Sequence, residues 1–196
     1  MTNPSPDLAA LREAILCGDP SRAMPALVGL REVPLEQAVP LLLLGLEQSM
    51  FMVRSLSCAG LGVKQNEAGW QALVAAMQDD EDANVRAEAA NALVSHSLER
   101  AWPLLRDLFA ADQQWLVRCS ILSALAEQPA IDPAWLLELA SMAITDADGT
   151  VRVGGAEILA RLVRDQGAAE ARVLLQQLQA DPDHRVVAAA LNGLQS

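Results

Sequence analysis

The sequence is poor in the residues on which most sheet-based folds and reaction sites depend. Its 196 residues include no tyrosine, two phenylalanines, four tryptophans, three cysteines and two histidines. So few aromatic side chains, in a chain dominated by alanine and leucine, argue against a β-sheet protein. An apolar fraction of 52% is also too high for a disordered chain. These absences predict an all-α fold.

The cysteines Cys17, Cys58 and Cys119 are too few and too far apart for a disulfide framework or a zinc cluster. We expect them to be reduced, buried thiols of a cytoplasmic protein. The first residues lack a basic start followed by an apolar run, so no signal peptide is predicted. The longest apolar stretch is also far shorter than the ~20 residues that cross a bilayer. A soluble protein without membrane insertion is therefore expected.

Charge and motif content exclude further classes. Acidic residues outnumber basic ones by 25 to 14, which gives a net charge of −11, and a nucleic-acid backbone would be repelled. His96 and His184 stand far apart, and no group of His, Cys and carboxylate residues has the spacing of a metal site. No Ser–His–acid arrangement or phosphate-binding glycine loop is visible either. We expect no catalytic residue, no metal and no cofactor.

A valine recurs along the chain at intervals of 32 to 35 residues, and in four of five copies an arginine follows it. A leucine stands eight residues after each valine, a spacing that places both side chains on one face of a helix. A second apolar helix is predicted ahead of each valine, opening near Trp70, Trp102 or Trp135. The repeating unit is therefore a helix, a short acidic turn and a second helix. The five valines are Val53, Val85, Val117, Val151 and Val186.

The turn before each second helix carries its own pattern. Asp82, Asp148 and Asp183 come three residues ahead of their valines, where a carboxylate can cap the free N–H groups of a helix. We expect the recurring arginines to pair with these turns, Asp82 with Arg86 and Asp148 with Arg152, at the i to i+4 spacing. Because the arginines recur with the repeat, a structural role is favoured over an anion-binding row.

The run from Asp82 to Leu93 resembles the second helix of a HEAT repeat, and more narrowly the short HEAT-like repeats of the phycobilisome lyase type. The resemblance covers residues 34–196, and residues 1–33 are interpreted as a degenerate N-terminal helical cap. It implies a right-handed α-solenoid of five HEAT-like helix pairs in one continuous domain. In such a solenoid the second helices line the inner, concave surface.

Polar side chains at three, six and ten residues after the repeat valine lie on a narrow arc of the second helices, away from the core. In the first repeat these positions are apolar, with Leu56, Ala59 and Val63. One tryptophan breaks the repeat phase beside a turn, where a bulky aromatic side chain can anchor a partner. The predicted partner-binding residues are Glu88, Asn91, Ser120, Ser123, Glu127, Glu157, Arg161 and Trp115.

Two functions fit this pattern. The first is a non-enzymatic scaffold or adaptor that binds another protein on the concave face, because a preorganised surface loses little entropy on docking. The alternative is implied by the family resemblance alone: a bilin lyase, or a lyase subunit or chaperone, that acts on phycobiliproteins. Only this alternative would require a bilin as cofactor. The sequence leaves the partner and the oligomeric state open.

Overall fold

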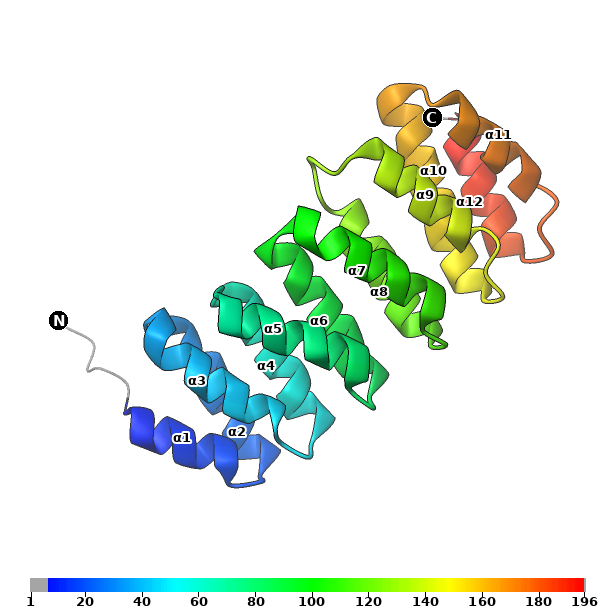
Figure 1. Ribbon diagram of the computed structural model, residues 1–196. Helices are drawn as coiled ribbons and strands as arrows, with labels where there is room; N and C mark the ends of the chain where they lie inside the picture. Colours follow the sequence, from blue (N-terminus) through cyan, green and yellow to red (C-terminus); the bar gives the residue numbers. More distant parts are fainter. Residues whose placement is uncertain (1–6, 196) are drawn as a thin grey trace. The chain divides into compact units, whose positions relative to one another are not determined.

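A computed structural model describes residues 7–195 (Figure 1). This part of the chain forms twelve α-helices and one short 3-10 helix, and it contains no strand. The chain divides into two compact units, residues 1–101 and 102–196. Each unit is a stack of antiparallel helix pairs, as the repeat pattern predicts.

In the first unit, the second helix of each pair packs against the second helix of the next pair. Helix α2 packs against α4, and α4 packs against α6, while α3 and α5 pack on the helices that follow them. The elements of this unit are α1 (Leu8–Leu16), α2 (Pro20–Gly29), η1 (Leu30–Glu32), α3 (Leu35–Leu46), α4 (Phe51–Val63), α5 (Glu67–Asp79) and α6 (Ala83–His96).

The second unit repeats this arrangement. Helix α8 packs against α10, and α10 packs against α12, while α9 and α11 each pack on α10. Helix α7 begins four residues before the boundary between the units. The predicted fold class, an all-α solenoid of HEAT-like helix pairs, is confirmed. The helices are α7 (Leu98–Ala111), α8 (Trp115–Ala126), α9 (Pro133–Ala143), α10 (Gly149–Gln166), α11 (Ala169–Leu178) and α12 (His184–Gln195).

The repeat residues form the core. All five repeat valines are at most 2% exposed, and the leucines eight residues later are fully buried in the first four copies. Leu194, in the last copy, is half-buried on α12, which packs on α10 and α11. Trp102 is buried and stacks on Trp135 with 5.2 Å between the ring centroids. The predicted boundary at residue 33, between the cap and the first repeat, stays a prediction.

The cysteines differ in their surroundings. Cys58 is buried, as expected, and burial raises the pKa of its thiol to about 12. Cys119 is half-buried. The expectation is wrong for Cys17, which is exposed because it ends α1 immediately before a turn at Gly18, whose φ is 75°. No helix within residues 7–195 is both long enough and apolar enough to span a membrane.

Candidate partner-binding surface

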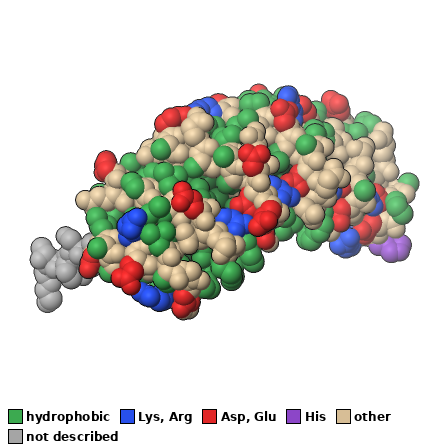
Figure 2. Space-filling view, turned by 60° about the horizontal axis from the view of Figure 1, so that its bottom comes forward, with side chains coloured by type: hydrophobic (Ala, Val, Ile, Leu, Met, Phe, Trp, Pro, Cys, Tyr) green, Lys and Arg blue, Asp and Glu red, His purple; other side chains and the backbone are tan. Residues whose placement is uncertain are grey.

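Ion pairs join consecutive repeats within each unit. On the face that Figure 2 shows, acidic and basic side chains lie next to one another among apolar ones. The recurring arginines contribute three bidentate pairs with aspartates that follow 26 to 29 residues later. In each, Nε lies 2.6–2.8 Å from one carboxylate oxygen and Nη2 lies 2.9 Å from the other: Arg54–Asp80, Arg118–Asp146 and Arg152–Asp181.

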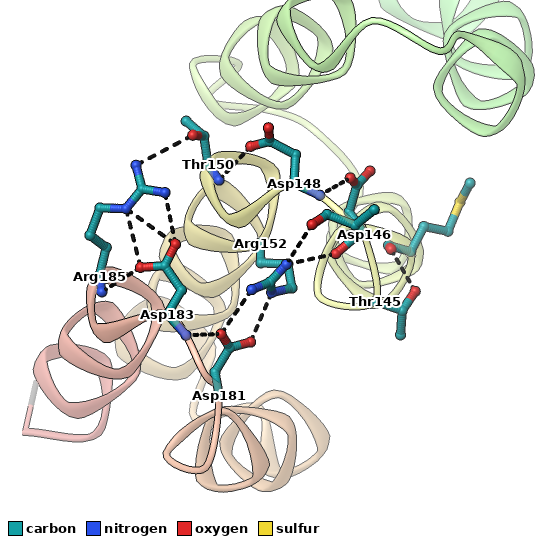
Figure 3. Close-up of polar contacts among 10 residues, drawn as sticks. Thr145, Asp146, Asp148, Thr150, Arg152, Asp181, Asp183 and Arg185 are labelled. Carbon is teal, nitrogen blue, oxygen red and sulfur yellow. Dashed lines mark hydrogen bonds and ion pairs between the residues drawn. The ribbon is translucent and has the colours of Figure 1, made fainter.

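The pair of Arg152 and Asp181 shows how these arginines are held (Figure 3). Nη1 of Arg152 donates to the carbonyl oxygens of Asp146 and Ala147, and Asp181 also accepts from the backbone N–H of Asp183. The two side chains of the pair are 14% and 8% exposed. The hydrogen bond from Arg152 lowers the pKa of Asp181 and raises the pKa of the arginine. All three nitrogens of the Arg152 guanidinium therefore donate hydrogen bonds within the chain, which gives this arginine a structural role.

The predicted pairing of Arg152 with Asp148 is wrong. The carboxylate of Asp148 instead accepts from the N–H of Thr150 and caps α10, so it faces the helix end. Asp82 caps α6 in the same way. Nη1 of Arg86 donates to two carbonyl oxygens of the preceding turn. The predicted caps and the structural role of the arginines are confirmed, but the partner of Arg152 comes from the next repeat.

Four of the predicted partner-binding residues line one groove between α8 and α10. They are Ser123 and Glu127 from α8 and its C-terminal end, and Glu157 and Arg161 from α10. The groove has a volume of about 260 Å³. Leu122, Ala126, Gly154 and Ile158 complete its lining. A Cβ atom at position 154 would lie 2.9 Å from Cδ1 of Leu122, so glycine allows the two helices their close approach.

The groove is acidic because Arg161, the basic residue in its lining, forms hydrogen bonds and an ion pair within the chain. Arg161 donates to the carbonyl oxygens of Ala126 and Gln128 at the end of α8 and pairs with Asp165 at 3.4 Å. It thus satisfies carbonyl groups that a helix end leaves free. Glu127 and Glu157 are exposed, and neither makes an ion pair or side-chain hydrogen bond within the described part of the chain. Two carboxylates therefore remain available to a partner.

The other predicted residues lie elsewhere. Glu88 and Asn91 are half-buried on α6, in the first unit, and burial raises the pKa of Glu88. Ser120 is half-buried on α8, one turn before the groove. Trp115 is the first residue of α8, and its side chain is 46% exposed. The structure therefore gathers four of the eight predicted residues into one site.

The histidines and carboxylates form no metal site in residues 7–195, where no three potential ligands come together. His96 ends α6, with Nε2 lying 2.9 Å from the carbonyl oxygen of Leu61 and the ring packed on Trp70 at 5.9 Å. These contacts give His96 a structural role in the first unit.

Comparison with known families identifies the repeat. Residues 39–126 match the family model for HEAT repeats. This segment therefore consists of HEAT repeats, and over these residues the resemblance to HEAT repeats found in the sequence is confirmed. The sequence has no significant match among curated proteins.

Solved structures support the same fold. The YibA protein of Escherichia coli has a TM-score of 0.68 at 17% identity, over 96% of this chain and 70% of its own. An engineered protein has a TM-score of 0.57 at 18% identity, over 97% and 96% of the two chains. The CpcE–CpcF complex of phycocyanin lyase from Nostoc sp. PCC7120 also matches, at 22% identity over 97% and 100% of the chains. Its TM-score of 0.41 is too low to bear on function.

Proposed function

We propose that this chain is a non-enzymatic, cytoplasmic scaffold that binds another protein, and that the groove between α8 and α10 is one of its contact surfaces. The observation that carries the proposal is the pair of exposed carboxylates, Glu127 and Glu157, beside the buried apolar side chains of Leu122 and Ile158. Such a surface is complementary to a partner that carries lysine or arginine side chains around an apolar contact.

The size of the groove supports a partner's side chains over a free ligand. Pockets that enclose a drug-sized molecule have volumes of about 300–1,000 Å³, and this groove has about 260 Å³. Complementary charge mainly sets the encounter rate and the specificity of a complex. Added salt should therefore weaken binding without abolishing it.

The test reverses both groove charges in one variant, Glu127→Lys/Glu157→Lys. The matched control, Glu47→Lys/Asp79→Lys, makes the same change of charge at exposed carboxylates near the ends of α3 and α5 in the other unit. Glu88 is left unchanged, because burial there would penalise a lysine for reasons unrelated to binding.

Tagged proteins are incubated with native lysate, and the retained proteins are identified by mass spectrometry. We expect at least one protein to be retained by the wild type and the control but lost from the groove variant. Circular dichroism should show the same helix content in all three. If all three proteins retain the same set of lysate proteins, the groove is not the contact surface.

A further inference from the structure

A second groove, with the opposite charge, lies in the first unit between α2 and α4. Its volume is about 230 Å³, and its lining is mostly apolar. The lining includes two of the most exposed large apolar side chains in the described chain, Val28 at 60% and Val63 at 58%. Leu56 and Ala59 from α4, both half-buried, also line the groove. An exposed apolar hollow of this kind is typical of a binding surface.

The close approach of α3 and α4 deepens the floor. Gly60 of α4 faces Leu42 of α3, where a Cβ atom would lie 2.4 Å from Cδ2 of the leucine. Both residues line the groove. The hollow is therefore built by the backbone spacing of buried helices, and it is present before any partner arrives.

The charged residues that line this groove are both basic, in a chain whose net charge is −11. Nζ of Lys64 donates to the carbonyl oxygens of Arg31 and Val33 at 2.8 and 2.7 Å, which leaves one of its three N–H bonds free. Arg31 is exposed, and its guanidinium makes no ion pair or hydrogen bond within residues 7–195. Glu32 follows Arg31 but does not line the groove.

We infer that this groove docks a helical segment of a partner protein that inserts an apolar side chain and carries carboxylates beside its apolar stripe. Val28 and Val63 would cover the apolar side chain, and Arg31 and Lys64 would meet the carboxylates. This surface is independent of the α8–α10 groove, because the partner chemistry is opposite and the residues lie in the other unit.

An anionic membrane is a poorer fit to the same residues. Segments that bind acidic lipid carry clusters of about four to eight basic residues, whereas two line this groove. A bilayer would also face the excess of acidic side chains elsewhere on the chain, while a short peptide responds mainly to charges within a Debye length of ~10 Å.

The probes are two designed helical peptides with the same leucine stripe, one flanked by glutamates and the other by lysines. Binding to the full chain is measured by fluorescence anisotropy at low salt. We expect the glutamate peptide to bind about tenfold more tightly, since the exposed Arg31 and the half-buried Lys64, which keeps one free N–H bond, each add a modest favourable contribution. Arg31→Glu should remove or reverse this preference.

The apolar contact is tested with Val28→Gln/Val63→Gln, which should weaken binding of the glutamate peptide at least several-fold without changing helix content. The matched control is Val173→Gln, because Val173 is 51% exposed on α11 in the other unit and should be neutral. Equal binding of the two peptides, or undiminished binding by the double variant, would overturn the inference.

Two other occupants are distinguished in the same experiments. Sedimentation that shows a dimer, dissociated by Val28→Gln/Val63→Gln, would assign the groove to a second copy of this chain. Co-sedimentation with phosphatidylserine vesicles, without peptide binding, would assign it to a lipid surface. Either result overturns the inference but leaves the α8–α10 proposal standing, because that proposal is tested with Glu127 and Glu157.

Discussion

The ion pair between Arg152 and Asp181 should be worth a measurable share of the stability, and Asp181→Asn is the change that tests it. A charge-assisted hydrogen bond contributes about 1.5–3 kcal/mol, and removing one member of a fully buried pair costs about 3–5 kcal/mol. The pair keeps 14% and 8% exposure, and Arg152 retains its bonds to the carbonyls of Asp146 and Ala147. We therefore expect a loss of ~1–3 kcal/mol.

The assay is urea unfolding followed by far-ultraviolet circular dichroism. The control is Glu13→Gln, which breaks the pair between Glu13 and Arg22 at 3.3 Å, whose side chains are 76% and 53% exposed. An exposed pair of this kind contributes at most about 1 kcal/mol. A double-mutant cycle with Arg152→Met isolates the coupling between Arg152 and Asp181. If Asp181→Asn costs no more than Glu13→Gln, or if the coupling is zero, the pair does not hold the repeats together.

The same pair predicts the direction of the pH dependence. Because the folded-state pKa of Asp181 lies below its ordinary value, the unfolded chain takes up a proton at higher pH than the folded one. The stabilisation is therefore fully present above the ordinary aspartate pKa of about 3.9 and is lost as the pH falls through the lower folded value. The difference in unfolding free energy between wild type and Asp181→Asn should shrink below about pH 4. A constant difference from pH 7 to pH 3 would contradict this origin.

Three further predictions follow from the core, the helix contacts and the grooves. Leu93→Ala should cost ~2–5 kcal/mol in urea unfolding, because Leu93 is fully buried, whereas Leu194→Ala should cost less because Leu194 is half-buried; equal losses would contradict a stacked array with an end. Gly62→Ala should lower the thermal midpoint, because the new Cβ atom would lie 3.0–3.1 Å from Cβ and Cα of Ala92. A linear tetrapyrrole should show no absorbance shift with the purified chain at micromolar concentration, since the α2–α4 groove and the α8–α10 groove are both smaller than pockets for drug-sized ligands; a clear shift would revive the bilin lyase alternative.

The repeat and the core could be predicted from the sequence because they depend on local spacing. Val85 and Leu93 lie eight residues apart on one helix face, and a helical period is sufficient to place both of them in the core. The caps formed by Asp82 and Asp148 were predictable for the same reason, since a cap and the N–H group it accepts from lie within three residues of each other.

Contacts between repeats were less predictable. Asp181 lies 29 residues after Arg152, and only its position two residues ahead of the capping Asp183 marks it in the sequence. The same Asp-x-Asp spacing recurs at Asp80 and Asp146 and could have identified all three pairs. No sequence pattern identifies the contacts of Arg161, because it donates to backbone carbonyl groups of the preceding repeat, which every residue type has.

The groove between α2 and α4 was only half visible in the sequence. Val63 belongs to a repeat position that was recognised as apolar in the first copy. Val28 and Arg31 come from the segment interpreted as a cap, and no periodic pattern connects them to α4. Which side chains border a groove depends on the packing of helices far apart in sequence, and that packing required the structure.

The aspartate turns have a consequence for how a chain of this kind could grow. Each one carries two carboxylates with different partners. One pairs with the arginine of the preceding repeat, and the other caps the second helix of its own repeat (Figure 3). A duplicated repeat therefore carries one member of each new inter-repeat ion pair: an arginine for the repeat that follows it and an aspartate turn for the repeat that precedes it. Tandem duplication of a whole repeat would therefore form complete arginine–aspartate pairs at the new junctions, without further substitutions there. The pairs already differ in spacing, with 26 to 29 residues between arginine and aspartate, so the connections between helices absorb length changes of a few residues without breaking the pair.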